Sequence, residues 1–290
     1  MYGPHQTPYI SDMSKTRFTG PSFKIAVGAV VLALVAAGCG SDDDVAFDDV
    51  PTGSATITEP GDIDFVEISP FARFGPAQGD FTAGEHGTFG IFGEGAASPP
   101  HTHSGSYYAV VLGGEMNNPF GTETDPPSLA PGSFWAVPAD EQHLTACLTP
   151  DEECRFFFHS AGAFDFLPID ALTDEPTSDG VAAPVGEIDF RSLDPFTGAA
   201  TMWGDRDGGA HGTIIRLEQG QESGQLAHRN EFTLVPISGS LSIDLGDDAR
   251  DLSPGSVVEA EANTPHSLGC DGTDDCLFYV FGDSPMEISS

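Results

Sequence analysis

Residues 95–114 read GAASPPHTHSGSYYAVVLGG, and this stretch decides the fold class. His101 and His103 stand two residues apart, just before an apolar run that ends in two glycines. Side chains two residues apart in a β-strand point to the same face, so both imidazoles project together and Tyr107 shares their side. An aromatic and β-branched run between turn residues is typical of a strand in an all-β protein.

A second stretch, GSFWAVPADEQH at residues 132–143, adds a third histidine, His143. It also runs from a glycine through a short apolar segment to a proline before the histidine. Imidazoles from neighbouring strands can hold one face of a metal ion, and imidazole suits Zn, Cu, Fe and Ni. The alternative is a set of ordinary core or surface histidines, but the spacing within the two stretches favours a metal site.

The chain contains an internal repeat. Gly61-Asp62-Ile63-Asp64-Phe65 returns as Gly186-Glu187-Ile188-Asp189-Phe190. The same relation, with a two-residue deletion on the way, pairs His86 with His211, His103 with His228, His143 with His266, and Cys147 with Cys270. Agreement at so many ordered points indicates a tandem duplication.

Short apolar runs cut by Gly, Pro and Asp predict strands throughout both copies. They cover residues 87–92, 107–112, 133–137, 155–159, 213–217, 232–237, 241–245, 256–260 and 277–281. We therefore expect an all-β protein with two domains, residues 61–168 and 186–290. Residues 169–185, rich in Asp, Pro, Ser, Gly and Ala, are expected to link them.

These motifs resemble those of the cupin superfamily. The first family motif is Gly, five residues, His-x-His, three or four residues, Glu, six residues, Gly; the second is Gly, five residues, Pro-x-Gly, two residues, His. The likeness covers both repeats and implies two tandem cupin barrels of the double-stranded β-helix, or jelly-roll, type. It also implies that His101, His103 and His143 are metal ligands. The wider sequence is similar to bacterial cupin-domain proteins of unassigned function.

Two departures from the family pattern matter: Tyr107 stands at the position of the Glu ligand, and Asp140 replaces the glycine after Pro138. Three neutral imidazoles leave a divalent ion with its full charge and with vacant positions, where it can polarise a carbonyl or lower the pKa of bound water. The expected cofactor is one divalent transition metal, Fe, Zn, Mn or Ni. Similar three-His cupin sites occur in thiol and diketone dioxygenases.

Two further side chains are candidates for catalysis. Tyr107 could donate a hydrogen bond to a bound oxyanion or act as an acid or base, although it could equally be an aromatic residue that fills the barrel. His159 could line the first cavity as a base beyond the ligands, or lie at the rim. His86 and His211 recur in the same Gly-Thr context in both copies, which favours a shared structural role.

The C-terminal copy lacks a complete site. Leu226 replaces the first histidine and Phe232 takes the position of Tyr107, while His228 and His266 remain. Two ligands make a weak site, so we expect a structural second barrel that pairs with the first.

The N-terminus resembles a bacterial lipoprotein signal. Lys15, Arg17 and Lys24 form a basic region, an apolar run follows, and Ala-Ala-Gly precedes Cys39. We expect residues 1–38 to be removed, Cys39 to be lipidated, and residues 39–60 to form a disordered acidic tether. Met13 is an alternative start, and a plain signal peptide is the alternative type. The protein would be exported and lipid-anchored to the bacterial cell envelope, with no other membrane contact.

The mature chain is strongly acidic. The full chain has 10 basic and 45 acidic residues; removal of residues 1–38 takes three basic and one acidic residue, leaving 7 arginines, 44 acids and a charge of −37. Such a charge repels nucleic acid and suits a solvated surface in a saline habitat better than a specific cation-binding role. The expected partners are a small-molecule ligand or substrate and, through the cupin sheets, further copies of the chain.

Four cysteines remain after Cys39 in two close pairs, Cys147 with Cys154 and Cys270 with Cys276. Exported proteins favour disulfides, so we predict two local bridges. The alternative makes Cys147 or Cys270 a metal ligand, because each lies four residues after a candidate histidine.

Three functions remain open from the sequence: a metal-dependent, oxygenase-like enzyme acting on a small molecule, a binding or sensing lipoprotein without turnover, and a structural protein whose metal stabilises the barrel. The vacant positions of a three-His site favour the enzyme.

Overall fold

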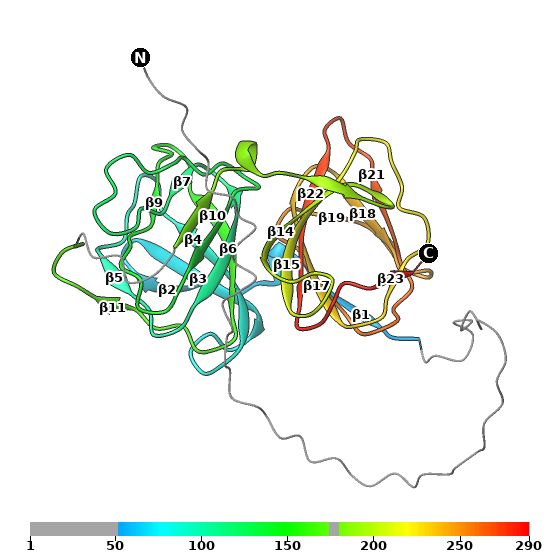
Figure 1. Cartoon of the computed structure of the whole chain (residues 1–290), viewed down its shortest axis with the longest axis horizontal. Helices are drawn as coiled ribbons and strands as arrows, with labels where there is room; N and C mark the ends of the chain where they lie inside the picture. The colour runs from blue at the N-terminus through cyan, green and yellow to red at the C-terminus, as the bar shows by residue number, and fades with distance from the viewer. Residues whose placement is uncertain (1–51, 174–179, 290) are drawn as a thin grey trace, which may run out of the picture. The chain divides into compact units, whose positions relative to one another are not determined.

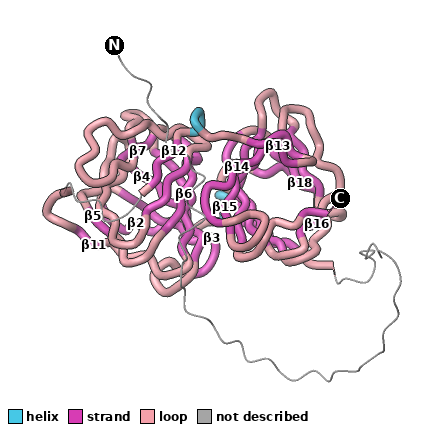
Figure 2. The backbone as a smooth tube through the Cα atoms, viewed as in Figure 1, coloured by secondary structure: helices cyan, strands magenta, loops and turns pink. Residues whose placement is uncertain are grey.

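The computed structural model describes residues 52–173 and 180–289. The predicted signal, Cys39 and residues 40–51 lie outside these ranges. The regular secondary structure of the described part is almost entirely β-strand, with the short 3-10 helices η3 (Pro60–Asp62) and η4 (Val185–Glu187) between strands (Figure 2). Within the described residues, no helix has the length and apolar character needed to cross a membrane.

One seven-stranded antiparallel sheet is built mainly from the first repeat (Figure 1). Its order is β12-β8-β6-β10-β4-β3-β2. The strands are β2 (Val66–Ser69), β3 (Ala72–Gly79), β4 (His86–Phe92), β6 (Tyr107–Gly113), β8 (Phe134–Val137), β10 (Cys154–Ser160) and β12 (Val181–Ala183). Two small pairs complete this half: β5 (His101–Thr102) with β11 (Leu167–Pro168), and β7 (Met116–Asn117) with β9 (Ala146–Cys147).

The second repeat builds a matching sheet in the order β1-β20-β17-β22-β15-β14-β13. The strands are β1 (Ala55–Thr58), β13 (Arg191–Leu193), β14 (Phe196–Gly204), β15 (His211–Leu217), β17 (Phe232–Ser238), β20 (Val257–Ala260) and β22 (Cys276–Gly282). Smaller sheets join β16 (Ala227–His228) to β23 (Ile288–Ser289), and β18 (Leu241–Asp244) to β19 (Ala249–Leu252) and β21 (Ser267–Cys270).

The two repeats exchange their first strands. β1 precedes the first repeat but pairs with β20 of the second sheet, with Thr58 opposite Val257. β12 precedes the second repeat but pairs with β8 of the first sheet, with Ala183 opposite Phe134. In the repeat, Thr58 corresponds to Ala183 and Val257 corresponds to Phe134, so the two pairings are equivalent and the exchange is reciprocal.

This exchange corrects two expectations. Part of the segment expected to be a disordered tether, residues 39–60, is strand β1, and part of the expected linker 169–185 is strand β12. Each segment is short and lacks long alternation, but its backbone groups complete the edge of a sheet, and that pairing outweighs the weak local signal.

Strand β10 shows how the core is divided. Phe156 and Phe158 point into one apolar cluster together with Tyr107 and Trp135. Phe157, on the opposite face, belongs to a cluster that takes residues from both sheets. Strands buried on both faces read as continuous apolar runs, which explains the Phe-Phe-Phe sequence. Burying each ring stabilises the fold by about 1.5–3 kcal/mol.

Both predicted disulfides are confirmed: Cys147–Cys154 joins β9 to β10, and Cys270–Cys276 joins β21 to β22. The turn glycine that recurs after β6 and β17 packs against them. Gly114 has φ +71° and Gly239 φ +85°, and a Cβ at either would lie about 2.7 Å from atoms of Cys154 or Cys276. Only glycine fits these positions, because both the conformation and the space exclude a side chain.

Candidate metal centre

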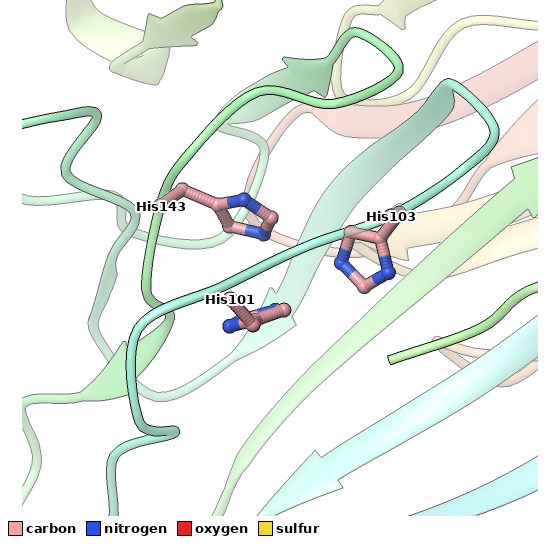
Figure 3. Close-up of side chains that lie close together, drawn as sticks. All are labelled: His101, His103 and His143. Atoms are coloured by element: carbon pink, nitrogen blue, oxygen red, sulfur yellow. The ribbon is translucent and has the colours of Figure 1, made fainter. Parts of the chain in front are cut away.

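His101, His103 and His143 converge at one point of the first repeat (Figure 3). His101 lies in β5, and its backbone N–H and C=O exchange hydrogen bonds with those of His143 at 3.0 and 3.1 Å. One ligand atom from each ring lies within 4.8 Å of the others. Among the residues that the structure describes, this is the only group of three or more metal-ligating side chains, and no carboxylate belongs to it.

Backbone carbonyls orient all three rings through Nδ1. His101 Nδ1 donates to the Pro99 carbonyl at 2.9 Å and His143 Nδ1 to the Glu141 carbonyl at 3.1 Å. His103 Nδ1 donates to the Asp165 carbonyl. Such bonds fix the tautomer and leave the Nε2 lone pair of each ring for a ligand. The Nε2 atom of His103 is buried and has no hydrogen-bond partner among the described residues.

Burial keeps the three imidazoles neutral. It lowers the pKa of His101 and of His103 from 6.5 to about 4, and it lowers the pKa of His143 well below its ordinary value. The neutral rings therefore offer their lone pairs throughout the neutral pH range. Neutrality, fixed tautomers and convergence together fit a divalent transition metal bound through Nε2.

Asp140, which departs from the family glycine, keeps the glycine-like backbone. Its φ is +63°, and its counterpart in the second repeat, Asn263, has φ +61°. Asp and Asn tolerate this left-handed conformation better than other non-glycine residues. The turn that leads to His143 is therefore preserved without the glycine.

Tyr107 lies beside the triad, as strand parity predicts. It is buried, its hydroxyl accepts the Trp135 indole N–H at 3.2 Å, and it lies 3.3 Å from His143 Nε2. Burial raises the pKa of the phenol. Tyr107 is therefore a neutral hydrogen-bond donor at the edge of the site.

His159 occupies neither of the two positions considered for it, the lining of this cavity or its rim. His159 is on the face of β10 opposite Phe158 and stacks on Phe281 of the second sheet, with ring centroids 4.1 Å apart. The Trp203 N–H donates to the Tyr279 hydroxyl at 2.6 Å, and that hydroxyl donates to His159 Nε2 at 2.9 Å. His159 therefore belongs to the packing between the two sheets. Because the apolar run of β10 is buried on both faces, its sequence does not show which face of the sheet each residue occupies, and the position of His159 could not be predicted from it.

The segment that follows β10 was not predicted to contribute to the site. Phe166 stacks on the His101 ring at 4.3 Å, and Phe164 lies 4.3 Å from the His103 ring. Phe166 is 37 % exposed whereas the three histidines are buried, so its ring separates them from solvent. The alternation Phe-Asp-Phe before Leu167 was a strand signal, but nothing in the sequence connected it to β5.

The second repeat preserves the framework of the site without its full set of ligands. Leu226 exchanges backbone hydrogen bonds with His266, as His101 does with His143. His266 Nδ1 donates to the Thr264 carbonyl at 3.0 Å, and the His228 ring stacks on Phe232 at 4.0 Å. Only two imidazoles face one another there.

The recurrent histidines His86 and His211 do not belong to the group of His101, His103 and His143. In each, Nδ1 hydrogen-bonds the threonine two residues on, Thr88 at 2.9 Å and Thr213 at 3.1 Å. Both are buried and make the same contact in both repeats, as a shared structural role requires.

The fold is similar to that of solved cupin-fold proteins. A proposed dioxygenase from Nostoc punctiforme has a TM-score of 0.61 at 13 % identity, covering 85 % of this chain and 89 % of that one. Oxalate decarboxylase from Lactobacillus farciminis has a TM-score of 0.55 at 13 % identity, covering 83 % and 90 %. Oxalate decarboxylase from Bacillus subtilis, studied for its Mn(II) centres, has a TM-score of 0.52 at 12 % identity, covering 83 % and 81 %.

At these identities the likeness establishes the fold alone. No curated protein matches the sequence. Residues 74–289 match a family described as "Domain of unknown function (DUF4437)". The match spans most of the chain, which therefore belongs to this DUF4437 family.

Proposed function

We propose that the protein is a metal-dependent enzyme of the cupin superfamily that acts on a small oxygen-bearing molecule. The observation that carries the proposal is the convergence of three neutral imidazoles, each oriented by a backbone carbonyl, with no carboxylate in the set. His101, His103 and His143 would hold one divalent ion, Fe, Zn, Mn or Ni. When bound, such an ion supplies Lewis acidity and vacant positions for a substrate oxygen.

The surrounding residues have separate tasks in this proposal. Phe164 and Phe166 cover the imidazoles and exclude water. Tyr107 holds its proton beside His143 Nε2. A histidine used as a ligand through Nε2 can no longer accept that proton, so the hydroxyl can donate to a substrate oxygen instead.

The structural neighbours support both parts of the proposal. The Bacillus subtilis protein holds Mn(II) centres, and the Nostoc protein is a proposed dioxygenase. We favour redox or carbon–carbon bond chemistry at the triad over a purely structural metal, because a structural site closes its coordination with a fourth protein ligand.

A ligand-binding or sensing protein without turnover is the second candidate. The position of His159 favours it, because His159 packs between the sheets and so leaves Tyr107 as the one sequence-predicted acid–base residue that touches the triad. A phenol with a raised pKa is a weak base at neutral pH.

We also propose that residues 61–168 and 186–290 are two tandem cupin barrels that exchange strands β1 and β12, and that the chain is exported and anchored through lipid on Cys39. Self-association through the cupin sheets belongs to the same proposal. Incorporation of labelled palmitate into the wild type but not into Cys39→Ala would support the anchor. Equal labelling of both would refute it.

Elemental analysis of the full chain, purified in detergent without added metal or chelator, tests the proposed metal. We expect about one transition metal per chain, and its identity separates oxygen chemistry (Fe, Mn) from hydrolytic chemistry (Zn). Wild-type protein that binds no metal even after reconstitution with Fe, Mn, Ni and Zn would contradict the proposal.

A further inference from the structure

A buried polar cluster lies one step beyond the triad. Thr145 follows His143 by two residues and so faces the same side. Asn118 lies across from Thr145, because the register pairs Asn117 with Ala146 and Phe120 with His143. Asn118 is 1 % exposed and Thr145 5 %. Both side chains therefore face the interior that the triad occupies.

Hydrogen bonds fix the orientation of the Asn118 amide. The Thr145 hydroxyl donates to Asn118 Oδ1 at 2.7 Å, and the Thr145 backbone N–H donates to Ser98 Oγ at 2.9 Å. The Thr145 hydroxyl also lies beside the Tyr107 hydroxyl. With Oδ1 turned toward Thr145, the amide nitrogen Nδ2 of Asn118 is buried, and no residue that the structure describes accepts a hydrogen bond from it.

An amide donor without a partner is costly inside a protein, so such groups generally meet a water or a ligand. Here the donor shares a cluster with Tyr107, whose hydroxyl is 3.3 Å from His143 Nε2. Tyr107 and Asn118 thus place two neutral donors on the same side of the ligand set.

We propose that Asn118 and Tyr107 together bind one oxygen of a carboxylate whose other oxygen lies at the triad, so that the substrate is a small carboxylic acid. The inference rests on the proposed function. Three neutral imidazoles leave the charge of a divalent ion uncompensated, which favours an anionic ligand. A carboxylate offers two acceptor oxygens, and hydrogen bonds to an ionised acceptor are strong inside an aromatic wall.

The test uses the full chain loaded with Co²⁺, whose visible spectrum reports ligands that reach the ion. Acetate is the carboxylate probe. Thiocyanate is the matched probe, because it binds metals without presenting a second carboxylate oxygen. Asn118→Asp keeps the shape but replaces the donor with an acceptor, and Asn118→Leu removes both at similar size. Asn117→Asp changes the neighbouring residue on the opposite face.

Both Asn118 variants should keep the cobalt content of the wild type and its thiocyanate affinity, while their acetate Kd rises at least about tenfold. Asn117→Asp should bind both probes as the wild type does. Unchanged acetate affinity in the two cobalt-loaded Asn118 variants would overturn the inference and leave the proposed metal site intact. Wild-type protein that fails to bind cobalt would overturn both.

Discussion

The two repeats differ most where their histidines meet. In the first, His101 and His143 are joined by backbone hydrogen bonds and His103 completes the set. In the second, the same backbone bonds join Leu226 to His266, and Leu contributes no ligand. The framework is thus independent of the ligands, because the same backbone pairing positions these residues whether or not they can bind a metal. The difference between a candidate metal centre and an apolar core is a few side chains on one backbone.

The largest expected effect is on metal content, at the position where the two repeats differ. His143→Ala should reduce bound metal from about one ion per chain to none, because two imidazoles hold a divalent ion weakly. His266→Ala, its counterpart, should retain about one. Elemental analysis of both variants after identical reconstitution decides, and equal loss from the two would refute a single site in the first repeat.

The next experiment tries to abolish the difference. Leu226→His restores the missing imidazole at a position whose backbone is already paired with His266. We expect metal content to rise from about one to about two ions per chain at saturating Zn²⁺. If it stays at one, the stacking of His228 on Phe232 holds that ring in an orientation unsuited to a ligand.

The two disulfides test the same comparison, because they occupy equivalent positions in the repeats but have different neighbours. They span seven and six residues, so replacing either pair by serine should lower the free energy of unfolding by about 2–3 kcal/mol. Only loss of Cys147–Cys154 should also weaken metal binding, since β9 begins three residues after His143. Denaturant melts and metal titrations of the two double variants measure both effects; equal metal affinity would show that the bridge does not support the site.

The smallest effect concerns His159 and its counterpart Phe281, which stack on one another. Burial lowers the pKa of His159 from 6.5 to about 3. Below pH 6.5 His159 is protonated in the unfolded chain but stays neutral in the folded chain. The free energy of unfolding therefore falls as the pH falls from 6.5 toward 3. His159→Phe should reduce this loss by about 1.4 kcal/mol per pH unit. Denaturant melts at pH 7.5 and 5 compare the variants, and parallel losses would contradict the assignment.

The strands and the triad were predictable because each depends on local signals. Apolar runs bounded by glycine predicted β4, β6, β8 and β10 to within two residues. Strand β3 contains Gly75 and Pro76, and β1 lies in an acidic segment, so neither showed a strand pattern. Strand parity placed His101 and His103 together, and the resemblance to the second cupin motif added His143.

The remaining parts of the site depend on contacts between distant segments. Nothing in the spacing connects Asn118 to Thr145, or Asp165 to His103. His159 shares a strand with Phe158, and only the position of the second sheet shows which face it occupies. Such positions are decided by tertiary packing, which single-sequence patterns do not encode.

The reciprocal exchange of β1 and β12 has a consequence for how the chain is made. Ala55 leaves the ribosome among the first described residues, yet its partner Ala260 lies near the end of the chain. Contacts this distant in sequence slow folding, since the intervening chain must be ordered first. Strand β1 therefore waits for a sheet whose other strands are all synthesised after it, whereas the first sheet is completed by β12, which is synthesised soon after its other strands. A break in the chain between the repeats would thus leave each fragment missing a strand that the other still carries.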